Sequence, residues 1–387
     1  MRILNQERLE KTLRDRLHCQ FAANRVNAVQ LLVLQDGKEV CALCEGYQSE
    51  YTKAPLRPDA MFRLASMTKP VTGVAALIAE ELGYFRITDK VEDHLAAFSK
   101  LYIARQEKDA IVRGEPCSVP LRIYHLLSHC NGIMADTPIG NALAGAIPKE
   151  AYQSVGAMAA YVAEQPLAFT PGTYSSYSAF SAFDVVAKII EDKSGMPYAE
   201  FVQRYIFDPL GIRDITYHPT EEQWQRTRML TEQIGSFTFL PLDFGKHTFE
   251  AMPLTYTGAG AGLVGSITDY AIFAEMLRNG GCYHGVRILP PERIREMATP
   301  YVAPDVPGRD PVSSWGLGVR VVDKEDVLPV GTFGWSGAYG THFWIDPVNK
   351  ITAIYMRANR GLDCGGGNAI SQQFERDVMG CLEQETT

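Results

Sequence analysis

The chain has 387 residues, 46% of them hydrophobic and 21% charged, and its formal net charge is −8. This composition is typical of a globular protein with a sizeable core, and it favours two domains or one large domain with an insertion. The chain has no dense stripe of lysine and arginine, which argues against nucleic acid as a partner. No apolar run approaches the ~18 residues of a membrane span, and residues 1–16 lack the apolar core of a signal peptide, so we expect a cytoplasmic protein without membrane contact.

The first predicted elements are a helix and a hairpin. Residues 5–22 carry leucines on one stripe, which predicts a helix with one buried face. Largely apolar strands are expected at 28–34 and 40–47, because Asp36-Gly37 between them is a hairpin turn signal.

A buried helix is predicted to start near Ser66 and to stop at Gly83. Pro70 fits its first turn, where amide groups lack intrahelical partners anyway. Ser66 and Lys69 then lie three residues apart on one helix face. A serine hydroxyl needs a base to take its proton, and a lysine can be that base once burial and the positive helix end lower its pKa. Ser66 and Lys69 are therefore a candidate nucleophile and base.

Between residues 85 and 235 the strand signals fade, and the pattern predicts helical or irregular structure at 88–98, 122–128, 155–164, 183–193 and 198–206. Strands return after residue 255. A glycine-rich turn at 258–262 precedes predicted helices at 266–279 and within 286–297, strands at 314–322, 331–335, 341–345 and 351–357, and a closing helix at 368–383.

These elements predict an α+β fold with an antiparallel β-sheet flanked by helices. Residues 1–84 and 236–387 are expected to form the sheet domain, and residues 85–235 a mostly helical inserted domain. The eight cysteines are scattered, so we interpret them as reduced structural thiols rather than disulfides.

Two later motifs could complete a site around Ser66. Tyr174 and Tyr177 follow Pro171-Gly172 just before an apolar helix, and a tyrosine there could relay a proton if Lys69 keeps its pKa low. Taken alone, such tyrosines are more often packed at a rim.

The third motif is Trp335-Ser336-Gly337-Ala338 at the end of a predicted strand. Its small residues would let a substrate lie against the strand edge, and a backbone amide there could help to hold an oxyanion. A glycine-rich corner of the sheet is an equally good reading of the motif alone.

Six motifs in this order resemble the serine β-lactamase and penicillin-binding-protein-like superfamily, and more closely its branch of C-type β-lactamases and family VIII carboxylesterases. The similarity runs from about residue 28 to 358. The motifs are Ser66-Met67-Thr68-Lys69, Leu126 to Gly132, Pro171-Gly172-Thr173 with Tyr177-Ser178, Pro209 to Ile212, Gly260 to Val264, and Ser314 to Gly318.

The resemblance implies a β-lactamase/transpeptidase-like fold with the active site between its two domains. It implies Ser66 as the acylated nucleophile, Lys69 as its base and Tyr177 as the proton shuttle, with Tyr174 as the fallback. Backbone amides of Ser66 and Ala338 would form the oxyanion hole. No metal or cofactor is expected, and the partner would be a small ester or amide substrate.

Two positions depart from that family. The tyrosine motif usually continues to an asparagine that binds the substrate amide, and Ala179 stands there. The third motif usually begins with a lysine or histidine that attracts a carboxylate, and Trp335 stands there, with Ser336 and Gly337 after it. Both changes weaken recognition of β-lactams or D-Ala-D-Ala peptides. We therefore expect a short-acyl carboxylesterase, with a β-lactamase, a D-amino-acid peptidase or an acyltransferase as alternatives.

Three other readings remain open. Gly334 to Ala338 nearly matches the Gly-x-Ser-x-Gly elbow of other hydrolases, which would make Ser336 the nucleophile. His125 and His129 are four residues apart, as in a zinc helix, but the glutamate of that motif is missing, so a structural role is favoured. The chain could also be a binding or scaffold protein that keeps the fold without catalysis.

Overall fold

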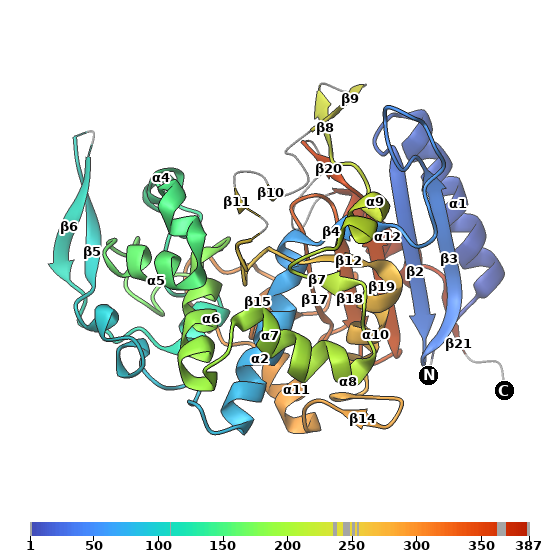
Figure 1. Cartoon of the computed structure of the whole chain (residues 1–387). Helices are drawn as coiled ribbons and strands as arrows, with labels where there is room; N and C mark the ends of the chain where they lie inside the picture. The colour runs from blue at the N-terminus through green and yellow to red at the C-terminus, as the bar shows by residue number, and fades with distance from the viewer. Residues whose placement is uncertain are drawn as a thin grey trace.

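The computed structural model describes residues 2–108, 110–234, 238–242, 248–249, 252–253, 255–361 and 369–384. A seven-stranded antiparallel sheet organises one half of the molecule (Figure 1). Its strand order is β15-β16-β17-β18-β19-β2-β3. The strands are β2 (Ala28–Gln35), β3 (Lys38–Gly46), β15 (Ser313–Trp315), β16 (Arg320–Val322), β17 (Phe333–Ser336), β18 (His342–Asp346) and β19 (Ile351–Met356).

Helices cover both faces of this sheet. On one face, α1 (Gln6–Ala22) and α12 (Ala369–Met379) pack over it, and the predicted leucine stripe of α1 is buried with Trp344 and Phe374. On the other face lie α2 (Lys69–Glu81) and α10 (Ile267–Arg278), which belong to the larger core. The hairpin turn between β2 and β3 has positive φ at Asp36 and Gly37, as the sequence signal predicted.

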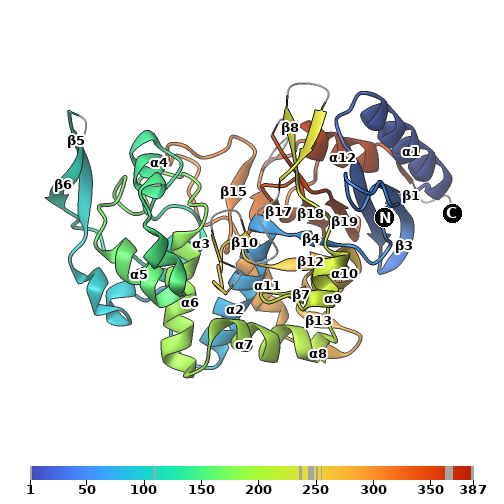
Figure 2. The same ribbon diagram turned by 45° about the horizontal axis from the view of Figure 1, so that its top comes forward.

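The other half of the molecule is mostly helical, and α2 lies between it and the sheet (Figures 1 and 2). Helix α6 (Ser181–Ser194) packs on α2, and its inward face is buried almost along its whole length. Helices α3 (Ile123–Leu127), α4 (Pro138–Gly145) and α5 (Val155–Ala163) lie in this half, whereas α9 (Glu221–Arg226) lies beside β4 in the sheet half (Figure 1). The other α-helices of the described residues are α7 (Tyr198–Val202), α8 (Asp208–Leu210) and α11 (Pro291–Met297).

Short strand pairs complete the fold. A three-stranded sheet has the order β4-β12-β7, and another has β20-β8-β9. The bounds are β4 (Met61–Arg63), β7 (Ile215–Thr216), β8 (Thr231–Ile234), β9 (Thr238–Pro241), β12 (Val264–Ser266) and β20 (Asn359–Arg360); the two-stranded pairs are β1 (Arg2–Leu4) with β21 (Leu382–Gln384), β5 (Tyr102–Glu107) with β6 (Ala110–Pro116), β10 (Thr248–Phe249) with β11 (Met252–Pro253), and β13 (Cys282–Tyr283) with β14 (Val286–Arg287).

The structure corrects four expectations. The hairpin β5–β6 lies where strand signals had faded, because its residues are half-buried or exposed and show no alternation of buried and exposed positions. Residues 88–98 form two short 3₁₀ turns rather than a helix. The predicted strand 314–322 is the hairpin β15–β16, which turns at Gly316–Gly318 with a positive φ at Gly318. The closing helix ends at Met379, and the last residues pair with β1.

The division into two domains stays a prediction, although β7 and β8, inside the predicted helical insertion, pair with strands that lie outside it. Among the described residues, no helix combines the length and the apolar character needed to cross a bilayer.

Candidate active site

Ser66 lies at a strained strand-to-helix junction. The strand β4 ends at Arg63, and the 3₁₀ turn η1 (Ala65–Thr68) leads directly into α2. Ala65 has φ of +47°, a left-handed conformation that costs free energy for a residue with a Cβ. Ser66 is 9% exposed, more than its neighbours Ala65 and Met67. Pro70 occupies the first turn of α2, as predicted.

Lys69 is fully buried and contacts three oxygen atoms. Its Nζ lies 3.1 Å from Ser66 Oγ, 2.5 Å from the carbonyl oxygen of Ala179 and 2.8 Å from that of Gly260. Burial lowers the pKa of Lys69 well below its usual value, because the ammonium form loses hydration, although the charge of Asp184 opposes this shift. The pKa of Lys69 is therefore shifted in the predicted direction. The two backbone carbonyls are partners that the sequence did not predict.

Asp184, on α6, anchors the glycine-rich turn that contacts Lys69. Its carboxylate accepts hydrogen bonds from the Tyr256 hydroxyl at 2.6 Å and from the Ala259 amide at 2.8 Å. Burial raises the pKa of Asp184 to about 6. Sequence reasoning missed this residue, and the signal was an acidic side chain within the apolar run of a buried helix.

Tyr177 reaches Ser66, whereas Tyr174 does not. The Tyr177 hydroxyl donates to Ser66 Oγ at 2.6 Å, and Trp335 Nε1 donates to the same hydroxyl at 3.1 Å. Burial raises the pKa of Tyr177 to about 12, although its bonds to Ser66 and Trp335 oppose the shift. The condition set for a proton relay, a Tyr177 pKa kept low by Lys69, is therefore not met. Tyr174 is 37% exposed and packs against Phe169.

Trp335 is more than the apolar wall that the sequence predicted, because its indole N–H bonds to the Tyr177 hydroxyl. Together with Trp315 and His129 it encloses the Tyr177 ring, at centroid distances of 5.3, 5.7 and 4.5 Å. These contacts fix the ring beside Ser66.

The two histidines of the zinc-like spacing have separate structural roles. His129 Nδ1 accepts from the Ser178 amide at 3.0 Å, and burial holds its pKa well below the usual value, so the ring is neutral beside Lys69. His125 Nδ1 accepts from the Arg122 amide at the start of α3. Among the described residues, no cluster of three or more potential metal ligands is found.

Glycine allows the end of β17 to approach the Ser66 turn. A Cβ on Gly337 would meet Thr341 Oγ1 at 2.1 Å and the Leu64 carbonyl oxygen at 2.3 Å. The Thr341 hydroxyl also bonds to that carbonyl, at 3.0 Å. Ala338 follows in the turn after β17 and is exposed. Within the described part of the chain, the amides of Ser66 and Ala338 have no hydrogen-bond acceptor.

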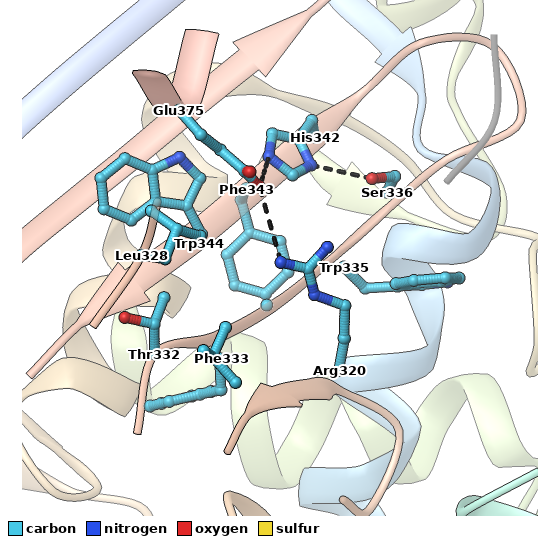
Figure 3. A pocket seen from close by; sticks show the side chains of 12 residues that line it. Arg320, Leu328, Thr332, Phe333, Trp335, Ser336, His342, Phe343, Trp344 and Glu375 are labelled. Atoms are coloured by element: carbon cyan, nitrogen blue, oxygen red, sulfur yellow. Dashed lines mark hydrogen bonds and ion pairs between the residues drawn. The ribbon is translucent and has the colours of Figure 1, made fainter. Parts of the chain in front are cut away.

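Two further residues predicted to contact the substrate, Ala179 and Ser336, have other roles in the structure. Ala179 contributes its carbonyl oxygen to Lys69. Strand alternation turns Ser336 to the face of β17 opposite Trp335. There its Oγ lies 2.8 Å from His342 Nδ1, and His342 Nε2 lies 3.2 Å from Glu375 Oε1 without hydrogen-bond alignment (Figure 3).

This second serine cluster is closed to substrates. Ser336, His342 and Glu375 are 3%, 5% and 5% exposed, and the cavity beside them has a volume of about 10 Å³, room for a single water molecule. In Figure 3 their side chains converge while the Trp335 ring points away. The segment after Ser336 is a turn and strand β18 rather than a helix, so the nucleophile elbow is also missing.

Comparisons with known proteins identify the family of the chain. Protein Rv1367c of Mycobacterium tuberculosis is 27% identical over 334 residues, which cover 80% of each chain. Esterase EstB of Burkholderia gladioli is 26% identical over 363 residues, covering 84% of each. The solved structure of EstCE1, described as a hydrolase with promiscuous acyltransferase activity, superposes with a TM-score of 0.77 at 22% identity, covering 97% of this chain and 98% of that one. The Beta-lactamase family model matches residues 9–362, and the chain therefore belongs to the Beta-lactamase family.

Proposed function

We propose that the protein is a serine hydrolase that acts through an acyl-enzyme on Ser66, and that its substrates are carboxylic esters with a short acyl group. The observation that carries the proposal is a chain of close polar contacts that ends at Ser66 and Lys69. Trp335 Nε1 donates to the Tyr177 hydroxyl, that hydroxyl donates to Ser66 Oγ, and Ser66 Oγ lies 3.1 Å from Lys69 Nζ.

The direction of the chain follows from the donors at its two ends. An indole N–H can only donate, so the Tyr177 oxygen accepts there and keeps its own proton for Ser66. A neutral Lys69 amine has two N–H groups, which the carbonyl oxygens of Ala179 and Gly260 occupy. Its remaining lone pair is then available to the Ser66 proton. Burial of Lys69 favours this neutral form.

Acylation can be written with these groups. Lys69 takes the Ser66 proton as Oγ attacks the ester carbonyl carbon, and the free amides of Ser66 and Ala338 receive the developing oxyanion. The bond from the acyl carbon to the alcohol oxygen breaks, and Tyr177, protonated because of its raised pKa, gives its proton to that oxygen. The Lys69 ammonium restores the Tyr177 proton. Water then attacks the acyl-enzyme, and its proton returns to Ser66 through the same groups.

Esters are favoured over β-lactams and D-Ala-D-Ala peptides. Ala179 offers no side-chain amide, and Trp335 supplies no cation for a substrate carboxylate. The similarity to esterase EstB supports the same substrate class. Transfer to a second alcohol would use the same acyl-enzyme, and the described activity of EstCE1 favours it as the second candidate reaction.

Turnover of p-nitrophenyl acetate, p-nitrophenyl butyrate and nitrocefin tests the proposal. We expect hydrolysis of both esters, faster for acetate, little nitrocefin cleavage, and loss of all turnover in Ser66→Ala. Faster cleavage of nitrocefin than of either ester would favour a β-lactamase. No turnover of any substrate by the folded wild-type protein would favour a scaffold that keeps the fold.

A further inference from the structure

A second cavity lies beside the candidate active site. It has a volume of about 180 Å³, and its walls include Trp315 and Trp335 together with Arg309, Ser313 and Arg320. We call it the tryptophan pocket. The two indole rings meet edge to face at 4.5 Å and 73°, so they form two walls of a corner.

The tryptophan pocket connects to Ser66 through Tyr177. Trp335 lines the pocket and donates to the Tyr177 hydroxyl at 3.1 Å, and that hydroxyl lies 2.6 Å from Ser66 Oγ. Trp315 stacks on the Tyr177 ring at 5.7 Å and 27°. The tryptophan pocket and the candidate active site therefore share Trp315 and Trp335.

The size and walls of the pocket suit one neutral aromatic ring. A cavity of about 150 Å³ is known to hold benzene, so this volume accommodates a ring with a short link. A flat ring can stack on one indole while its edge meets the other. The pocket has no excess positive charge to attract an anion, because Arg309 is paired with Asp323, Arg320 lies 3.9 Å from Glu375, and Asp310 also lines the wall.

We propose that the tryptophan pocket binds the alcohol half of the ester, and that this alcohol is of the benzyl type. The inference rests on the proposed function. In that mechanism Tyr177 protonates the alcohol oxygen as its bond to the acyl carbon breaks, so the leaving alcohol lies on the Tyr177 side. Alkyl-type alcohols need that proton, since their alkoxides are poor leaving groups. The products are the acyl-enzyme on Ser66 and benzyl alcohol, and the pocket accounts for recognition that a short acyl group cannot supply.

Two acetates that differ only in the ring test the inference. Benzyl acetate carries a flat aromatic ring, and cyclohexylmethyl acetate carries a puckered saturated one. We expect kcat/KM of the wild-type protein to favour benzyl acetate by about 3- to 10-fold. In Trp315→Leu the ratio of the two kcat/KM values should fall to the ratio of the rates at which the two esters hydrolyse in buffered base without protein. Trp224→Leu, which removes an indole outside the pocket, should retain it.

Binding measured without turnover separates this inference from the proposed function. Calorimetric titration of the Ser66→Ala protein with benzyl alcohol should show saturable binding, with a higher affinity than for cyclohexylmethanol. The double variant Ser66→Ala/Trp315→Leu should not bind benzyl alcohol. Ester turnover without benzyl selectivity and without this binding would overturn the pocket assignment and leave the hydrolase standing. Binding of benzyl alcohol by a protein that turns over no ester would support the pocket and overturn the reaction. Because the two wild-type rate constants need no variant, misfolding of Trp315→Leu would not remove the test.

Discussion

Two serines lie in hydrogen-bonded clusters on opposite sides of β17, and we propose that only Ser66 attacks a substrate. Ser336 contacts His342, and His342 contacts Glu375, in the order of a catalytic triad. This cluster is buried beneath α12. Ser66 has a lysine whose charged form is disfavoured, a tyrosine that keeps its proton and two amides without acceptors. Hydrogen-bond partners alone therefore do not distinguish the two serines. They differ in exposure, 9% for Ser66 and 3% for Ser336, and in the backbone amides without acceptors beside Ser66.

The largest expected difference in kcat/KM is between the Ser66→Ala and Ser336→Ala variants. We expect Ser66→Ala to lower kcat/KM for p-nitrophenyl acetate by about 10⁶-fold, as when a nucleophile is removed. Ser336→Ala should leave kcat/KM within about threefold and cost about 1 kcal/mol of unfolding free energy, because one buried hydrogen bond is lost. Steady-state kinetics and urea unfolding measure both. A Ser336→Ala protein that is folded but inactive would reverse the assignment.

Removing the amine should have the next largest effect. Lys69→Ala is expected to lower kcat/KM by about 10²- to 10⁴-fold, the usual contribution of a general base. Near-normal turnover by the folded variant would dismiss Lys69 from the mechanism.

The pH profile sharpens the same point. In the proposed mechanism the neutral amine is the active form, so kcat/KM should rise with pH as Lys69 loses its proton and reach a plateau well below pH 10.5, the ordinary pKa of lysine. A plateau reached only above pH 10 would mean that burial does not keep the amine neutral.

Tyr177→Phe removes the proton donor and keeps the ring. We expect kcat for benzyl acetate to fall by about 10²-fold with KM little changed, because a general acid acts in the transition state. Tyr174→Phe is the matched control on the same loop and should match the wild type. An effect confined to Tyr174→Phe would move the role to that residue.

The smallest expected effect concerns the sealed cluster and its stability. Burial alone would raise the pKa of Glu375, but His342 and Arg320 nearby lower it overall. Ionised Glu375 therefore stabilises the fold at pH values above 4.5, and this stabilisation is lost as pH falls through the lowered pKa. Urea unfolding between pH 3.5 and 6 should show a stability gap between wild type and Glu375→Gln that narrows towards acid. A gap that does not change with pH would mean that Glu375 acts only through packing.

Local patterns predicted much of this fold and part of the site. The leucine stripe of α1, the Asp36-Gly37 turn and the stop at Gly83 each follow from short-range physical rules, and the structure has all three. A helix start near Ser66 also followed from spacing alone, although the α-helix itself begins at Lys69, after a 3₁₀ turn that contains Ser66. The order of the motifs along the chain indicated which distant residues would meet.

Tertiary contacts explain what the sequence could not predict. The anchoring of the 258–262 turn by Asp184 depends on how α6 packs against α2. The bond from Trp335 to Tyr177 joins residues 158 positions apart, and only the folded sheet reveals it. The raised pKa of Tyr177 is set by burial, which the sequence does not specify at a loop position.

The most direct test of the Ser66 assignment is to locate a covalent label. The wild-type protein should be treated with a fluorophosphonate near neutral pH, digested and mapped by mass spectrometry. The account predicts one adduct, on the peptide that contains Ser66, and none on Ser336. An adduct on Ser336, or labelling that persists unchanged in Ser66→Ala, would contradict it.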